Sequence, residues 1–86
     1  MQKLSELPNI GSTLEKKLKQ AAILSSTDLI NIGAEQAFLR LSGIDENSCF
    51  NMLCALEGAV QGIRWHKLSK ERKAELKEFL NLKRQS

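Results

Sequence analysis

The residues best suited to binding chemistry form a turn near the N-terminus that leads directly into a lysine-rich helix. Pro8 excludes a helix interior and favours an extended Leu7, while Gly11 permits close backbone approaches. A helix that starts after such a turn presents free N–H groups and the positive end of its dipole, and both attract a phosphate. We therefore predict a site for the backbone of duplex DNA. Its candidate residues are Asn9, Ile10, Gly11, Ser12, Thr13, Lys16, Lys17 and Lys19.

The start of this helix carries a further signature. Ser12 followed by Glu15 fits a capping box, in which each side chain bonds the amide of the other residue. The whole run is typical of a helix-hairpin-helix element, although Asn9 stands where a second glycine is usual. Asn tolerates the left-handed region, so the turn is preserved. A structural helix corner needs the same residue types, and this is the alternative interpretation.

Catalytic chemistry has few candidate groups in this chain. His66 with Cys49 or Cys54 is the one nucleophile–base pairing available. The two cysteines lie five residues apart on a predicted apolar helix and point roughly 140° apart, which is too divergent for a disulfide between them. We therefore expect both to be reduced, and buried because the helix is apolar. A single histidine and no Cys-x-x-Cys leave a zinc site without ligands. We expect no enzyme activity, no metal and no cofactor.

The charge of the chain is concentrated near its C-terminus. The 86 residues carry a formal net charge of +3. Residues 1–62 hold five basic and seven acidic groups, whereas residues 63–86 hold eight basic and three acidic groups. The basic C-terminal segment could attract an anionic partner. Alternatively, it is simply a helix face exposed to solvent. Three phenylalanines, one tryptophan and no tyrosine are too few aromatic residues for a stacking platform on single-stranded nucleic acid.

A second candidate surface follows the longest apolar segment. Arg64 to Lys67 place a large ring among cationic groups, and small residues around Gly58 and Gly62 allow another helix to approach closely. This surface predicts docking of a protein partner or of a second copy of the chain, as an alternative to DNA binding. Trp65 packing the last helix onto the core is the structural alternative. The candidate residues are Glu57, Gln61, Arg64, Trp65 and His66.

Apolar spacing predicts an all-α fold, because no segment alternates with period two. We expect one domain over residues 1–86, a bundle of five to six helices with tandem helix-hairpin-helix-like units and a C-terminal helix. Thr27 and Asp45 are the expected N-caps, and Gly33 and Gly43 are expected to end helices. The expected helices are a short one at 4–7, then 13–22, 28–32, 35–41, 46–62 and 68–82.

The second of these units repeats the pattern of the first. Leu41 to Asp45 again place a leucine, turn residues and an isoleucine before a helix. Asp45 would repel a phosphate at that entry, so we expect the second unit to be structural. The N-terminus lacks an apolar run, and Asn51, Glu57 and Gln61 interrupt the longest apolar segment. We therefore expect a cytoplasmic protein without a membrane contact.

Several runs together resemble the C-terminal domain of the TfoX/Sxy family, bacterial regulators of natural competence. The runs are LPNIG with LEKKL at 7–18, GAEQAFLRL at 33–41, NMLCALEGAVQGIRWH at 51–66, Leu68, and RKAELK at 72–77. The resemblance implies a helical fold related to helix-hairpin-helix modules and a role in DNA transformation or its control. It supplies no active site. Two-domain members carry a further domain ahead of this one, whereas this sequence begins almost at the hairpin.

Overall fold

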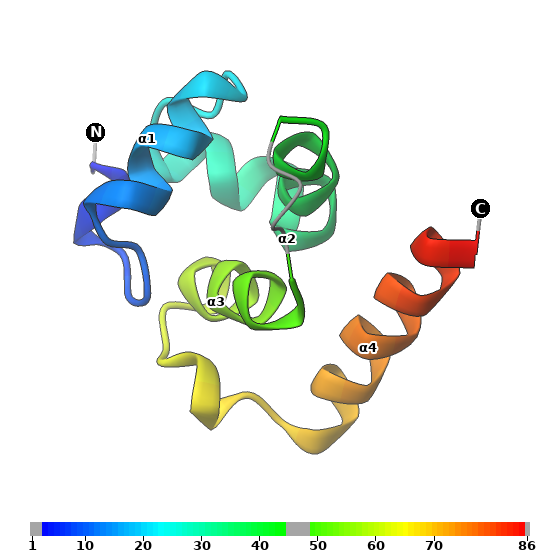
Figure 1. Cartoon of the computed structure of the whole chain (residues 1–86). Helices are drawn as coiled ribbons and strands as arrows, with labels where there is room; N and C mark the ends of the chain where they lie inside the picture. The colour runs from blue at the N-terminus through cyan, green and yellow to red at the C-terminus, as the bar shows by residue number, and fades with distance from the viewer. Residues whose placement is uncertain (1–2, 45–48, 86) are drawn as a thin grey trace.

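The computed structural model describes residues 3–44 and 49–85, and over these residues every regular element is a helix (Figure 1). The all-α class is confirmed. The described residues form four α-helices, fewer than the five to six expected. The short helix expected at 4–7 is a 3-10 turn, and the two helices expected on either side of Gly33 are joined in one kinked helix. The elements are η1 (Leu4–Glu6), α1 (Ser12–Gln20), α2 (Ser26–Ser42), α3 (Phe50–Gln61), η2 (Trp65–Lys67) and α4 (Lys70–Gln85).

The first long helix, α1, begins one residue earlier than expected. Gly11 is its N-cap in an extended conformation, so Ser12 is the first helical residue and makes no capping bond. The predicted capping box is therefore wrong. The Glu15 carboxylate instead accepts a hydrogen bond from the amide of Ser5 at 3.1 Å, which ties η1 to the side of α1.

The second helix is capped by Ser25 rather than by Thr27. The Ser25 hydroxyl accepts from the amide of Asp28 at 3.2 Å, and the Asp28 carboxylate accepts from the amide of Leu24 at 3.1 Å. The first bond satisfies an orphan amide in the first turn of the helix, and the second ties the incoming chain to this turn. Gly33 adopts φ 81 and ψ 164 and kinks α2 where two separate helices were predicted. The helix ends before Gly43, as expected.

The third helix is shorter than the predicted span 46–62. Cys49 is its extended N-cap and α3 runs from Phe50, so a helix through Cys49 is wrong. The predicted cap at Asp45, and with it the end of the repeated unit, lies outside the described residues. Gly62 ends α3 in the left-handed conformation, with φ 77, which glycine adopts without strain.

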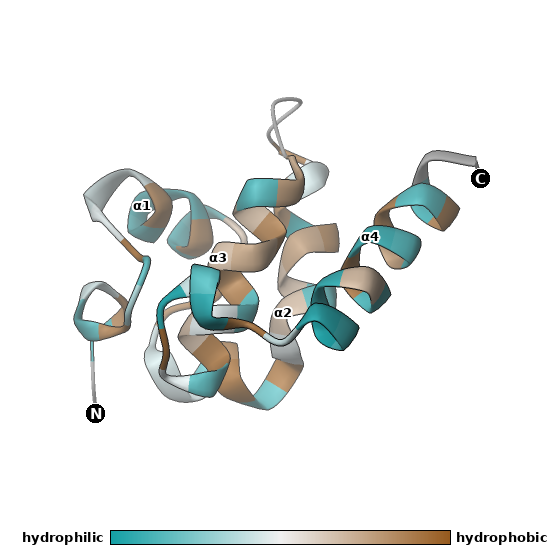
Figure 2. Cartoon of the chain, turned by 90° about the horizontal axis from the view of Figure 1, so that it is seen from below, coloured by the Kyte–Doolittle hydropathy of each residue, from teal (hydrophilic) through white to brown (hydrophobic). Residues whose placement is uncertain are grey.

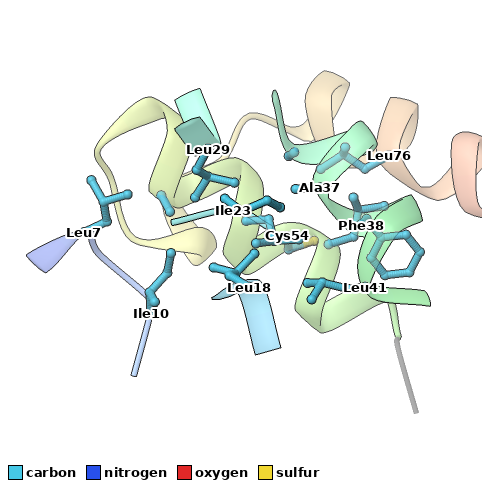
Figure 3. Close-up of a cluster of buried hydrophobic side chains, with 14 of the residues drawn as sticks. Leu7, Ile10, Leu18, Ile23, Leu29, Ala37, Phe38, Leu41, Cys54 and Leu76 are labelled. Atoms are coloured by element: carbon cyan, nitrogen blue, oxygen red, sulfur yellow. The ribbon is translucent and has the colours of Figure 1, made fainter. Parts of the chain in front are cut away.

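One hydrophobic cluster joins η1 and the four α-helices, and η2 contributes no buried residue to it (Figure 3). Leu18, Leu29 and Phe38 meet α3 in this cluster, and Leu76 and Leu80 bring α4 onto it. Beyond Leu80, α4 extends away from the other helices (Figure 1). Among the described helices, none is both long and apolar enough to cross a membrane.

The two cysteines differ in their surroundings, whereas both were expected to be buried. Cys54 lies inside the core, and burial raises the pKa of its thiol. Cys49 is exposed, because it precedes α3 instead of lying on its apolar face. Both are free thiols.

Candidate nucleic-acid interface

The hairpin, residues 7–11, connects η1 to α1 and has a buried inner side and an open outer side. Leu7 and Ile10 are buried in the core, while Gly11, Ser12 and Thr13 are exposed. The amide of Ile10 donates to the carbonyl of Leu7 at 3.5 Å and thus closes the turn. Ile10 is therefore not the open phosphate donor that was predicted. The first-turn amides of Ser12 and Thr13 remain, at a helix N-terminus without a side-chain cap.

The outer side of the hairpin borders an open depression of about 610 Å³. Ser5 to Gly11 line it from the hairpin side, and Arg64 lines it from the segment before η2. From the sequence, Arg64 was assigned to the protein-docking surface and Gly11 to the alternative DNA site. In the structure both residues line the same depression. The wall is not uniformly cationic, because Glu6 also lines the depression.

Asn9 holds the hairpin against α3 and η2. Its backbone takes φ 70, the left-handed conformation expected for this position. Its side-chain Nδ2 donates to the carbonyl of Ile63 at 2.9 Å and to that of Ala55 at 3.4 Å, and its Oδ1 accepts from the amide of Trp65 at 3.2 Å. The side chain thus bonds protein groups and positions the hairpin, whereas a direct DNA contact was predicted.

Gly58 is the position that this hairpin covers. A Cβ at Gly58 would lie 2.5 Å from the Asn9 side chain, 2.7 Å from the carbonyl oxygen of Ile63 and 3.2 Å from Cα of Trp65. Gly58 is thus closely covered, but by the hairpin and the chain leading to η2 and not by the helix that was expected. Gly62 has no neighbour within 4 Å of an added Cβ, so the predicted patch does not extend to it.

The lysines of α1 add positive charge near its N-terminus. Lys16 and Lys19 are exposed and share one helix face with Ser12, at i+4 and i+7. Lys17 lies about 100° further round this helix and is half-buried. The face of Ser12, Lys16 and Lys19 is thus the part of the predicted set that is open to an anion.

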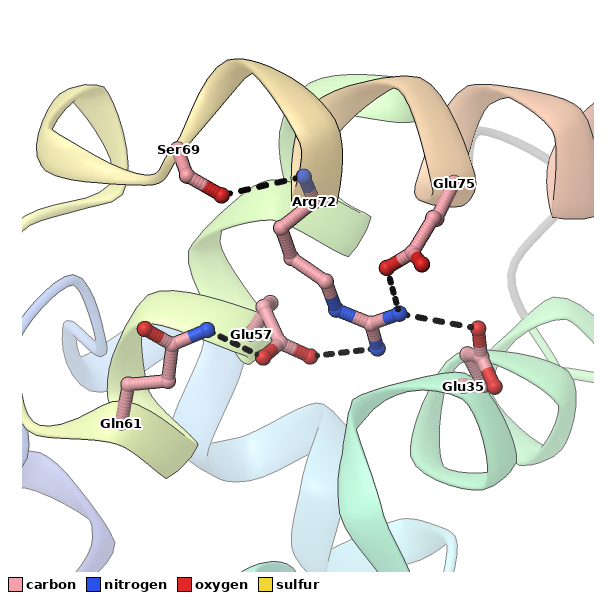
Figure 4. A network of polar contacts seen from close by, with 6 residues as sticks. All are labelled: Glu35, Glu57, Gln61, Ser69, Arg72 and Glu75. Carbon is pink, nitrogen blue, oxygen red and sulfur yellow. Dashed lines mark hydrogen bonds and ion pairs between the residues drawn. The ribbon is translucent and has the colours of Figure 1, made fainter.

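Glu57 does not belong to an exposed docking face. Its side chain is only 9% exposed. The carboxylate accepts a 2.9 Å hydrogen bond from Arg72 and another hydrogen bond from Gln61 (Figure 4). Arg72 also lies 3.2 Å from Glu75 and 3.6 Å from Glu35, which connects α4 to α3 and α2. Glu57 is therefore buried and not available for docking as predicted. Helical spacing could not indicate this burial, because its partner Arg72 is 15 residues away in the sequence.

This pairing sets the ionisation of both groups. Burial raises the pKa of Glu57, but the hydrogen bonds from Arg72 and Gln61 and the charge of Arg72 lower it by more, so the pKa lies below its ordinary value. The hydrogen bond to Glu57 raises the pKa of Arg72 despite burial. The role of Arg72 in joining these helices was not predicted from the sequence. The one indication was that an arginine lies near the start of a helix that must pack on α3.

Trp65 is 39% exposed and does not anchor α4 in the core. The neighbouring Leu68, which is buried, performs that function. The ring of His66 meets the indole edge to face at 5.1 Å, and the Lys73 ammonium lies 6.0 Å from the ring centroid. Trp65, His66 and Arg64 therefore form the exposed part of the predicted docking surface, together with Gln61.

Substitution of Asn9 separates its two structural roles. Asn9→Gly keeps the left-handed backbone and removes the side-chain bonds, so we expect a loss of about 1 kcal/mol in the free energy of unfolding. Asn9→Ala also strains the backbone, and we expect a loss of about 2 kcal/mol. Urea denaturation measures both. Equal stability of the parent and Asn9→Ala would contradict the positioning role.

Comparison with known proteins agrees with this architecture. The family model of the TfoX C-terminal domain matches residues 1–80. Two crystal structures from Listeria monocytogenes, one of an uncharacterized protein in a triclinic form and one of a protein of unknown function in a tetragonal form, are each 53% identical to this chain. Each match covers 88% of the present chain. The match covers 86% of the triclinic-form protein, with a TM-score of 0.87, and 93% of the tetragonal-form protein, with a TM-score of 0.86. No curated protein matches. The chain belongs to the TfoX C-terminal domain family.

Proposed function

We propose that this domain is a non-enzymatic part of DNA transformation or its control, and that it contacts duplex DNA through backbone phosphates. The observation that carries the proposal is the uncapped N-terminus of α1 beside a depression that Arg64 also lines. Helix-terminal amides and a guanidinium are both donors that suit phosphate oxygens. A competence-related role for the TfoX family is consistent with a DNA ligand.

The expected contact is weak. Ser12 and Thr13 offer backbone amides, Arg64 offers a fork of donors, and Lys16 and Lys19 add long-range attraction. The carboxylate of Glu6 opposes them. These groups suffice for two to three phosphates, and none of them is directed at a base edge. The affinity should therefore fall as the salt concentration rises and should not depend on the DNA sequence.

A duplex titration followed by fluorescence anisotropy of labelled DNA tests this function. For two phosphate contacts, affinity should fall about tenfold between 50 and 200 mM salt, with equal slopes for unrelated sequences. The Lys16→Glu/Lys19→Glu variant should bind at least about fivefold more weakly, because two attractive charges are reversed beside the site.

The matched control is Arg40→Glu/Lys77→Glu, which changes the net charge equally through exposed residues on α2 and α4. This control should bind more tightly than the α1 variant. Equal losses in both variants would show that only net charge matters, and an absence of binding at 50 mM salt would refute the proposal.

Docking of a protein partner or a second copy is the second candidate. The observation in its favour is the exposed Trp65 next to Arg64, since these residue types dominate the energetic centres of protein interfaces. Capture of the same proteins by the parent chain and by an Arg64→Ala/Trp65→Ala variant would count against this candidate.

A further inference from the structure

We infer that Trp65 holds one unpaired DNA base, so that the preferred ligand is a duplex end with a single-stranded overhang. The inference rests on the proposed phosphate contact at the hairpin and specifies which form of DNA that contact accepts. Its starting point is an exposed indole within a cationic surface on the same side of the molecule as the hairpin.

The indole stands in a strongly basic part of the chain. Arg64, Lys67 and Lys70, which lie within five residues of Trp65 along the chain, are exposed, and Lys73 places its ammonium over one face of the ring, 6.0 Å from the centroid. An exposed aromatic ring among cations offers both a stacking surface and attraction for a phosphate. A single indole provides room for one base, which agrees with the absence of a larger stacking platform in this sequence.

The backbone at Trp65 is held next to the proposed phosphate site. Asn9 in the hairpin accepts a hydrogen bond from the backbone amide of Trp65, and Arg64, the preceding residue, lines the depression next to Gly11. The hairpin and the chain entering η2 lie side by side (Figure 1). A strand whose phosphate lies at the hairpin can thus reach the indole. Because the hairpin and η2 are already joined, little ordering is needed on binding.

The surface around Trp65 favours a free base over a base inside a duplex. Residues of η2 are mainly hydrophilic in Figure 2, and Arg64, His66 and Lys67 beside Trp65 are exposed polar or charged residues. Opening a base step in an intact duplex costs a few kcal/mol, whereas an overhang already presents an unstacked base. An acidic protein segment would also match the charge, and the DNA ligands described below distinguish this partner from an unpaired base.

Three DNA ligands of equal duplex sequence test this inference: a blunt duplex, the same duplex with a short thymidine overhang, and the same duplex with an abasic overhang. Trp65 is the only tryptophan and the chain has no tyrosine, so its fluorescence reports on the site directly. We expect the thymidine overhang to bind at least about fivefold more tightly than the blunt duplex and to quench the fluorescence. The abasic overhang, with the same phosphates, should give neither effect.

Two variants assign the preference to the ring. Trp65→Ala should bind all three ligands like the blunt duplex, and Trp65→Phe should retain part of the overhang preference; labelled-DNA anisotropy measures both. The backbone bond to Asn9 is available in each variant, and thermal unfolding checks their fold. Overhang preference that survives Trp65→Ala, or equal affinity of the parent for all three ligands, would overturn the inference while the proposed function stands. If no ligand binds, both fail, and the surface is left to a protein partner.

Discussion

Arg72→Met should lower the free energy of unfolding by about 3 kcal/mol, because it leaves the Glu57 carboxylate buried without its cation. The Arg72 side chain is 28% exposed, which places the loss at the lower end of the range for broken buried ion pairs. Methionine keeps the length and apolar part of the side chain, so the lost charge causes the effect. Urea denaturation near neutral pH measures the loss.

Two comparisons make this result specific. Lys77→Met removes an exposed cation from the same helix and should change stability by less than about 0.5 kcal/mol. Glu57→Leu/Arg72→Met replaces both partners by apolar groups and should recover much of the loss. If Arg72→Met is as stable as Lys77→Met, the polar network of Figure 4 does not hold α4 in place.

The pH dependence of the same pair has a defined sign. The pKa of Glu57 is lowered in the folded chain, so its stabilising contribution is complete above the unfolded value of about 4.3 and is lost as pH falls through the folded value. In Arg72→Met, burial acts without the arginine and favours the neutral carboxyl. The stability difference between the parent and this variant should therefore shrink below about pH 4. A difference that grows on acidification would contradict this sign.

Gly58→Ala should destabilise the chain by about 3 kcal/mol, the upper end of the cost of overpacking. Its Cβ would lie 2.7 Å from the carbonyl oxygen of Ile63 and 3.2 Å from Cα of Trp65, and these backbone atoms cannot move aside as a flexible side chain can. The same change in an exposed helix interior is stabilising by about 1 kcal/mol, so the expected sign is reversed here. Thermal or urea unfolding measures it.

Gly11→Ala is the matched control for this substitution. Gly11 has an extended φ of −94 and no neighbour within 4 Å of an added Cβ, so only a change in helix capping is expected, below about 1 kcal/mol. Gly58→Ala should also separate the hairpin from η2 and weaken the overhang preference. A variant at Gly58 that unfolds like the control would show that the hairpin does not rest on α3.

Apolar periodicity predicted the parts of the fold that depend on local sequence. The inward side of α4 with Leu76 and Leu80 follows from this spacing, and the non-helical conformation at Gly33 follows from the preference of glycine for helix ends. Helix starts were less predictable, since neighbouring residues compete as caps. Ser25 is the N-cap of α2 where Thr27 was expected, and Gly11 is the N-cap of α1 where Ser12 was expected. The path by which the preceding chain enters each helix decides which of these neighbouring residues is the cap.

The candidate site depended on contacts that no local pattern contains. Asn9 bonds Ile63 across 54 residues, and Glu57 bonds Arg72 across 15. Helical spacing placed Glu57 on a solvated face, whereas its partner lies on a different helix. For the same reason the hairpin and Trp65 were interpreted as separate sites, although a hydrogen bond to Asn9 joins them in the folded chain.

Backbone amide chemical shifts during titration with a blunt DNA duplex test the phosphate contact most directly. At low salt we predict shifts at Gly11, Ser12, Thr13 and Arg64, which disappear as salt is raised, while Lys77 on α4 stays unchanged. These residues surround the uncapped end of α1 and its depression. Saturating DNA that leaves the amides of Gly11 to Thr13 unshifted at low salt would contradict phosphate binding by the hairpin.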